Sequence, residues 1–394
     1  MLWPLLTALA CLPGAGGDGS DSSHHAVLLV SLDGLRSDYL EMADTPTLDR
    51  LISAGARAES LVPPFPSKTF PSHWTQVTGL HPENHGIVDN TIFDPTTDRW
   101  FSMMDDEATA DPRWWGGEPV WLAAERQGLR ASTLFWPGSE AWPASTHVPY
   151  NGSLSWDSRI EIALDWLSDP DPPQFVTLYL PEPDSTGHDF GPDHPELSRE
   201  IESVDAWLGE LVDGLEQRGL DGVDLVVVSD HGMTGISSEQ VVFLDDVIDP
   251  DAHLLVTWTP VTNLFTDTPD DVLEALAALD HVTCALKGDL EPRLHFAASD
   301  RIGDVVCLAD EGWSISSRGF WGAHPEVYEG GTHGYDPALP SMHGILVARG
   351  PSFVEGVSVE SVEGVDVYGL LCAALGIEPE ANDGDFSAVE SLLR

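Results

Sequence analysis

The chain has 394 residues, enough for one large α/β domain or two smaller domains. Its 66 acidic residues against 17 basic ones give a formal charge of −49. Such a surface repels nucleic-acid duplexes and anionic lipids, which argues against a role in binding polyanions. A phosphate-bearing substrate would have to be attracted locally, by bound cations.

The first residues, Met1 to Cys11, form an apolar run that is too short to span a bilayer and predicts a signal peptide. Ala10-Cys11, followed by a stretch rich in Gly, Ser and Asp, is similar to a bacterial lipoprotein cleavage site with a flexible tether. We expect residues 1–25 to be signal peptide and tether. The protein would then be exported: periplasmic, secreted, or attached to a membrane by a lipid on Cys11.

From Ala26 onward, strand patterns and helix patterns alternate. Residues 26–32 form an apolar run that predicts a strand buried on both faces of a parallel sheet. A helix is then expected from Pro46 to residue 52, with Thr45 as its N-cap and Pro46 at its first position. The next expected elements are a helix at 120–127, a strand at 131–135, a helix at 159–167, a strand at 175–180, a helix at 196–218 and a strand at 225–229.

Between residues 255 and 313 the pattern changes to short β-like runs around a helix at 270–279. We interpret this as a small lobe inserted into one catalytic domain, residues 26–394, whose core resumes with a strand at 344–348. The alternation predicts an α/β fold, a mostly parallel sheet flanked by helices. Cys284 and Cys307 lie in two β-like runs, so a disulfide is compatible with an oxidising compartment, and Cys372 is expected in the core.

Carboxylates and imidazoles gather after the predicted strands, where sites of parallel sheets lie. The set is Asp33, Asp184, His188, Asp230, His231 and His333. Mixed oxygen and nitrogen ligands of this kind suit zinc, with other divalent ions open. Asp184 and His188 would share one face if their segment is helical. Alone, Asp184 also suits a helix N-cap and Asp33 a turn, but together the residues favour a metal site.

Thr69 is the candidate nucleophile. It lies in Pro64-Phe65-Pro66-Ser67-Lys68-Thr69-Phe70-Pro71, where three prolines predict a bend. A free threonine hydroxyl is a poor nucleophile near neutral pH, so it needs a base or a metal ion that stabilises the alkoxide. The neighbouring Lys68 either assists phosphate binding or is a surface charge.

Seven motifs, in this order along the chain, closely resemble the nucleotide pyrophosphatase/phosphodiesterase family of the alkaline phosphatase superfamily. They are Leu32-Asp33-Gly34, Lys68-Thr69-Phe70-Pro71-Ser72-His73, the stretch 78–87, Phe135-Trp136-Pro137-Gly138-Ser139, Glu182-Pro183-Asp184-Ser185-Thr186-Gly187-His188, Ser229-Asp230-His231-Gly232-Met233 and Thr332-His333-Gly334-Tyr335-Asp336. The resemblance covers about 26–353. It implies an alkaline phosphatase-like core and hydrolysis of phosphodiester or pyrophosphate bonds in nucleotides through a phospho-threonine intermediate.

Carried over by position, the resemblance also implies two zinc ions per chain. One would be held by Asp33, Thr69, Asp230 and His231, and the other by Asp184, His188 and His333. Thr69 would be the nucleophile, and Asn90 would hydrogen-bond a non-bridging phosphate oxygen. Phe70 and Tyr150 match positions that stack a nucleobase, although both also suit ordinary core or rim aromatics.

Other functions stay open at this point. A phospholipid or choline-phosphate diesterase of the same family, a phosphate monoesterase and a catalytically silent binding protein would all share this fold. The presence of Thr69 and of every implied ligand favours an enzyme. Four further histidines, His73, His81, His85 and His343, match no ligand position, and we expect them to be structural or to support the ligands.

Overall fold

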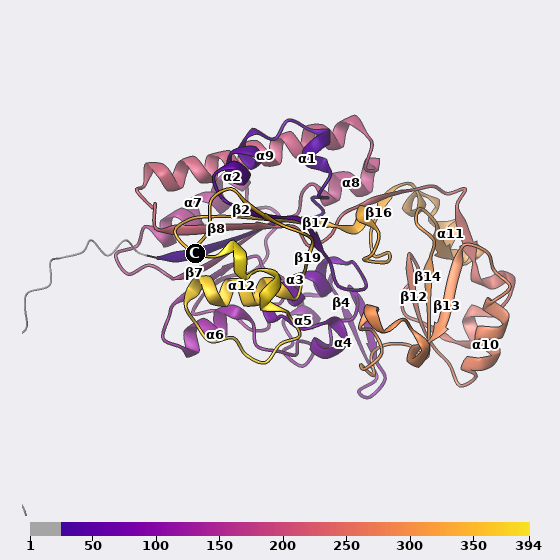
Figure 1. Ribbon diagram of the computed structural model, residues 1–394. Helices are drawn as coiled ribbons and strands as arrows, with labels where there is room; N and C mark the ends of the chain where they lie inside the picture. The colour runs from indigo at the N-terminus through magenta and orange to yellow at the C-terminus, as the bar shows by residue number, and fades with distance from the viewer. Residues whose placement is uncertain (1–24) are drawn as a thin grey trace, which may run out of the picture.

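The computed structural model describes residues 25–394, so the predicted signal peptide, most of the tether and Cys11 lie outside the described residues. A nine-stranded sheet forms its centre (Figure 1). Its strands are β1 (Ala26–Leu32), β2 (Ala56–Val62), β5 (Ala131–Leu134), β6 (Thr146–Val148), β7 (Phe175–Leu180), β8 (Val223–Val228), β17 (Gly344–Arg349), β18 (Val357–Val359) and β19 (Val362–Glu363). Their order is β18-β2-β17-β8-β1-β7-β5-β6, and β19 also pairs with β2.

Strands β8, β1, β7, β5 and β6 are parallel, whereas β17 runs antiparallel to β8 and β2. The predicted mostly parallel α/β sheet is therefore confirmed. The helices are α1 (Tyr39–Met42), α2 (Pro46–Ser53), α3 (Thr69–Thr78), α4 (Pro82–His85), α5 (Asp106–Thr109), α6 (Val120–Arg126), α7 (Trp156–Leu167), α8 (Asp184–Phe190), α9 (Pro195–Gln217), α10 (Pro269–Leu276), α11 (Arg318–Ala323) and α12 (Asp366–Leu375).

Helices cover both faces of the sheet, and β1 shows why its sequence is apolar throughout. Val27 and Leu29 point into an apolar cluster with α3, α6 and α12, while Leu28 and Val30 point into a second cluster with α2, α7 and α9. Figure 1 shows the two helix layers on opposite sides of the sheet. A strand that contacts a core on each face needs apolar side chains at consecutive positions. Cys372, expected in the core, is buried in α12.

The start of α2 lies where it was expected, with Thr45 as the N-cap residue. Thr45 precedes the helix, but its side chain forms no capping hydrogen bond. Asp205 of α9 takes that role, because its carboxylate accepts from Thr47 N at 2.9 Å and from Leu48 N at 2.8 Å. Thr45 is thus the N-cap residue with Pro46 at the first helical position, as predicted, but the side chain that caps the helix belongs to a residue far away in the sequence.

A four-stranded sheet lies within the segment predicted as an inserted lobe, to one side of the main sheet (Figure 1). Its order is β11-β12-β14-β13, formed by β11 (Leu254–Leu255), β12 (Val261–Phe265), β13 (Val282–Leu286) and β14 (Val305–Ala309). Cys284 and Cys307 are register partners on β13 and β14 and form a disulfide. The division into residues 1–25 and 26–394 stays a prediction.

Three two-stranded sheets complete the fold. They are β3 (Thr91–Asp94) with β4 (Arg99–Ser102), β9 (Thr234–Ile236) with β16 (Gly330–Thr332), and β10 (Val241–Phe243) with β15 (Ser314–Ser316). Within the described part of the chain, no helix is both long and apolar enough to cross a membrane.

Candidate active site

Three aspartates follow three neighbouring parallel strands. Asp33 comes directly after β1, Asp230 follows β8, and Asp184 begins α8 shortly after β7. Because β8, β1 and β7 are adjacent and parallel, their carboxyl ends meet at one edge of the sheet. Candidate ligand atoms of Asp33, Asp184 and His231 all lie within 4.8 Å of one another, as do those of a second group, Asp184, His188 and His333.

Gly34 allows this close approach. Its φ of +69° is in the left-handed region, and a Cβ atom on it would lie 2.8 Å from Asp184 Cα. Its amide also donates to Asp230 Oδ1 at 3.1 Å. Gly34 thus lets the ends of β1 and β7 come together and anchors one oxygen of the aspartate that follows β8.

Asp33 and Asp230 are buried and Asp184 is partly buried, and each carboxylate has one buried oxygen without a hydrogen-bond partner among the described residues: Asp33 Oδ1, Asp184 Oδ1 and Asp230 Oδ2. On Asp33 the other oxygen accepts from Tyr179 Oη at 2.7 Å. A buried acceptor left unpaired costs free energy, so such groups are rare in folded proteins. Bound cations would satisfy all three oxygens, and the donor set therefore fits a metal centre.

The three candidate histidines are held in one arrangement. Each ring lies with Nδ1 near a backbone carbonyl oxygen, to which it can donate: His188 to Gly331 at 2.8 Å, His231 to Gly232 at 2.9 Å and His333 to Ser67 at 2.8 Å. With the proton on Nδ1, the lone pair is on Nε2, the atom that faces the carboxylates. His231 Nε2 lies 3.0 Å from Asp230 Oδ2, and His333 Nε2 lies 3.7 Å from Asp184 Oδ1.

Burial and neighbouring charges shift the pKa values of the candidate ligands, and at His231 the lowering by burial is outweighed by the charge of Asp230, so that its pKa is raised. Burial raises the pKa of Asp33 well above its ordinary value, and the charges of Asp230 and Asp184 raise it further. Burial also tends to raise the pKa of Asp230, but the neighbouring His231 and His73 outweigh burial and hold the pKa of Asp230 at about 2. Burial and the neighbouring His231 lower the pKa of His333 well below 6.5, which favours the neutral ring that a metal ion requires.

Thr69 is buried beside this cluster, with its Oγ1 3.3 Å from His231 Nε2. The bend of the predicted stretch lies at Phe65 and Pro66, and Thr69 follows it as the first residue of α3. The amino end of a helix presents free backbone amides and a positive dipole, which favour an anion. The surface-charge alternative for Lys68 was also wrong, because Lys68 is buried and paired with Asp89.

The residues implied in substrate binding lie on different segments. Asn90 Oδ1 accepts from Phe70 N at 2.9 Å, which places Asn90 next to the first turn of α3. Phe70 is half-buried and packs against Phe101 and Trp115, with ring centroids 5.9 and 5.7 Å away. Tyr150 comes from the loop after β6 and is 53% exposed.

Two further residues support the site: His73, which we expected to be structural or to support the ligands, and Tyr179, which the sequence analysis did not single out. His73 lies one helical turn after Thr69, and its Nδ1 donates to Thr69 O at 2.8 Å while its Nε2 accepts from Ser31 Oγ at 2.8 Å. Both nitrogens are engaged, so His73 supports the site although it lies near Asp33 and Asp230 with metal-like spacing. Tyr179, the hydrogen-bond donor to Asp33, had only one signal: a hydroxyl inside an otherwise apolar strand.

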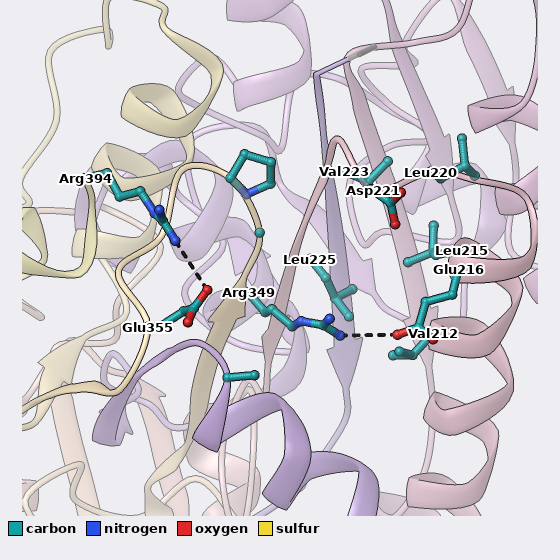
Figure 2. A pocket seen from close by; sticks show the side chains of 13 residues that line it. Val212, Leu215, Glu216, Leu220, Asp221, Val223, Leu225, Arg349, Glu355 and Arg394 are labelled. Carbon is teal, nitrogen blue, oxygen red and sulfur yellow. Dashed lines mark ion pairs between the residues drawn. The ribbon is translucent and has the colours of Figure 1, made fainter.

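A pocket of about 420 Å³ lies at the opposite edge of the main sheet (Figure 2). It is lined by Val223 at the start of β8 and by Arg349 at the end of the antiparallel β17. Figure 2 shows the ion pair between Arg349 and Glu216 in it. None of the predicted site residues lines this pocket.

Comparison with known proteins agrees with this geometry. Residues 27–336 match the family model described as type I phosphodiesterase / nucleotide pyrophosphatase. Bis(5'-adenosyl)-triphosphatase ENPP4 of Bos taurus is 38% identical over 394 residues, covering 97% of this chain and 85% of the relative. Venom phosphodiesterase of Macrovipera lebetinus is 36% identical over 390 residues, covering 93% of this chain and 45% of the relative.

Solved structures show the same likeness. Murine ectonucleotide pyrophosphatase / phosphodiesterase 5, as an inactive threonine-to-alanine variant in complex with AMP, matches with a TM-score of 0.89 at 35% identity. The match covers 94% of this chain and 100% of that chain. The human protein of the same name matches with a TM-score of 0.88.

Proposed function

The chain belongs to the type I phosphodiesterase / nucleotide pyrophosphatase family, and from that premise we propose that it is a two-zinc enzyme that cleaves nucleotide diesters and pyrophosphates through Thr69. One observation carries the proposal. Three buried carboxylate oxygens without partners and three imidazole Nε2 atoms converge beside a threonine hydroxyl at the amino end of a helix. This donor set suits zinc, and its members fall into three overlapping groups, one of which also includes His73.

The proposed ligands divide as the resemblance implies. Asp33, Thr69, Asp230 and His231 would hold one ion, and Asp184, His188 and His333 the other. When bound, two such ions stabilise an alkoxide and neutralise charge on the attacking and leaving oxygens of an in-line displacement.

The chain's own residues then carry out two displacements. Thr69 Oγ1 loses its proton to solvent and forms a bond to phosphorus as the bond from phosphorus to the leaving oxygen breaks, and the leaving group departs as an alcohol or a phosphate. Water next attacks the phospho-threonine, the nucleoside monophosphate leaves, and Thr69 regains a proton. The amide of Asn90 would donate to a non-bridging oxygen throughout. Because Asn90 is uncharged, it leaves room for the second substituent of a diester.

Nucleotides are the proposed substrate class. Phe70 and Tyr150 would stack the base, since aromatic faces bind nucleobases without a strict sequence preference. Two properties of relatives support this: one is named for hydrolysis of a bis(5'-adenosyl) triphosphate, and another has been solved in complex with AMP. That the second is an inactive threonine-to-alanine variant agrees with a threonine nucleophile.

The test compares nitrophenol release from nitrophenyl thymidine 5'-phosphate and from nitrophenyl phosphate by the zinc-loaded protein. We expect a strong preference for the diester, and its loss in Thr69→Ala but not in Thr97→Ala, which alters an exposed threonine on the β3–β4 turn. Metal analysis should give about two zinc ions per chain. Preference for the monoester, activity in Thr69→Ala, or less than one zinc per chain would each contradict the proposal.

We also propose that the protein is exported, either released or attached by a lipid on Cys11. The Cys284–Cys307 disulfide supports an oxidising compartment. Mass spectrometry of the N-terminus of protein from fractionated cells tests this. A chain that retains Met1 and is found in the cytosol would contradict it.

A further inference from the structure

Lys68 and Asp89 form a buried ion pair directly beside the proposed nucleophile. Lys68 Nζ donates to both oxygens of Asp89, at 2.9 and 3.0 Å, and the two side chains are 10% and 2% exposed. We propose that this pair is a positioning device that fixes the amide of Asn90 relative to Thr69. The inference rests on the function proposed above and assigns these two residues a role in it.

The connections lie on both sides of Thr69. Lys68, the residue before it, is tied to Asp89, and Phe70, the residue after it, donates its backbone amide to Asn90 Oδ1 at 2.9 Å. Asp89 and Asn90 are themselves joined, because Asp89 Oδ1 accepts from Asn90 N at 2.7 Å. The residues before and after Thr69 are thus both hydrogen-bonded to the segment Asp89-Asn90.

The same contacts orient the Asn90 side chain. Since Oδ1 accepts from a backbone amide, the amide is fixed with Nδ2 at its free end. No described residue accepts a hydrogen bond from this nitrogen, so it is available to a phosphate oxygen. Asn90 also caps α3 from outside the helix, because the N-cap residue Lys68 forms no side-chain capping bond.

Stability alone does not account for the pair. Desolvation of two charges offsets most of their attraction, and replacement of a buried pair by neutral residues is often neutral or stabilising. What the pair supplies is a defined geometry. Gly334 packs against the lysine of this pair. A Cβ atom at Gly334 would lie 3.0 Å from Lys68 Cε, so the glycine lets the loop after His333 pack on the lysine stem.

The test uses the double variant Lys68→Met/Asp89→Asn. Each single variant would leave one charge buried without a partner and would destabilise the fold, whereas the double variant is neutral at both positions. We expect its melting temperature to stay close to that of the wild type. Its kcat for nitrophenyl thymidine 5'-phosphate should fall about tenfold, a positioning effect, with KM changed less than threefold.

A matched control is Arg349→Met/Glu216→Gln, which removes one positive and one negative charge at the far edge of the sheet (Figure 2). It should keep the wild-type kcat. A wild-type kcat in Lys68→Met/Asp89→Asn would overturn the proposal.

A double-mutant cycle with Asn90→Ala separates positioning from a general structural effect. If the pair acts through Asn90, adding Lys68→Met/Asp89→Asn to Asn90→Ala should change kcat less than twofold. The same tenfold loss in both backgrounds would overturn the positioning role while the enzyme proposal stands. Absence of Thr69-dependent diesterase activity in the wild type would instead overturn the proposed function itself.

Discussion

Buried aspartates occur both at the carboxyl edge of the main sheet and at the contact between α2 and α9, and the two regions treat them differently. Asp205 in α9 is 1% exposed, and its carboxylate accepts from two backbone amides at the start of α2. At the sheet edge, Asp33 and Asp230 are also buried and Asp184 is partly buried, yet each keeps one buried oxygen without a partner among the described residues.

The difference teaches what burial of a carboxylate means. With two backbone donors, a buried charge satisfies amides that would otherwise lack partners, and so it stabilises the fold. With one buried oxygen of each left unpaired, three neighbouring carboxylates repel one another and lower the stability of the metal-free protein. Such a cost persists where function requires it, so the unpaired oxygens distinguish the site from structural aspartates.

The largest expected effect is on activity, in Asp230→Asn. Loss of this proposed charged metal ligand should lower kcat/KM by about a thousandfold or more. The new amide nitrogen can donate to His231 Nε2, which lies 3.0 Å from the oxygen it replaces, so the metal-free protein should be as stable as the wild type or about 1 kcal/mol more stable. Urea unfolding of chelator-treated protein measures this. A large loss of stability would remove the contrast with Asp205.

Asp205→Ala should show the opposite behaviour. It leaves Thr47 N and Leu48 N without their acceptor and should lower the free energy of unfolding by about 2–3 kcal/mol. The zinc-loaded enzyme should keep its kcat at temperatures where it is folded. The control Asp213→Ala changes a more exposed aspartate of α9, paired with Arg50 at 3.6 Å, and should cost less than about 1 kcal/mol. Equal losses in the two variants would contradict a specific cap.

A buried histidine that is fully partnered extends the comparison to pH. His85 accepts from Ile87 N at 3.1 Å through Nδ1 and donates to Thr75 Oγ1 at 3.0 Å through Nε2, so its ring is held neutral. Burial, aided by His81, lowers its pKa to about 3. Stability from this group is complete above the ordinary pKa of 6.5, where the unfolded chain is also neutral, and is lost as the pH falls towards 3.

Between pH 7 and pH 5, the contribution of His85 to the free energy of unfolding should fall by about 2 kcal/mol. His85→Gln should therefore show a correspondingly shallower loss over this range in urea unfolding at a series of pH values. His324→Gln, at a histidine whose side chain is 52% exposed, serves as control and should follow the wild type. Parallel curves for all three proteins would contradict the assignment.

The sequence predicted most of the layout because its main signals are local. β1 was expected at 26–32 and is found there, and the core helices begin and end within about three residues of their expected positions. The convergence of Asp33, Asp184 and Asp230 was also predictable, since residues after neighbouring parallel strands must meet at one edge. The structure adds that β8, β1 and β7 are adjacent in the sheet, which is what brings the three aspartates together.

The features that were missed depend on contacts distant in sequence. Thr45 is the N-cap residue of α2 as expected, but the capping hydrogen bonds come from Asp205, because a carboxylate on a packed neighbouring helix reaches the free amides. Lys68 is buried because Asp89 lies opposite it, which no local pattern indicates. β2 contains Arg57 and Glu59 and therefore lacks the continuous apolar run of a buried parallel strand, although it pairs with β17.

Tyr179→Phe tests the comparison at its finest level, because Asp33 has one partnered oxygen and one that is free. The phenol donates to Asp33 Oδ2 at 2.7 Å, which turns Oδ1 towards the proposed metal. Loss of such a supporting hydrogen bond should weaken zinc binding about tenfold, about 1.4 kcal/mol, as measured by competition with a chelating dye. Tyr328→Phe removes another buried hydroxyl hydrogen bond, to Ser316 Oγ at 2.6 Å, and controls for a general loss of packing. If Tyr179→Phe and Tyr328→Phe bind zinc with the same affinity, the hydrogen bond from Tyr179 does not orient Asp33. The surrounding fold alone would then hold this carboxylate.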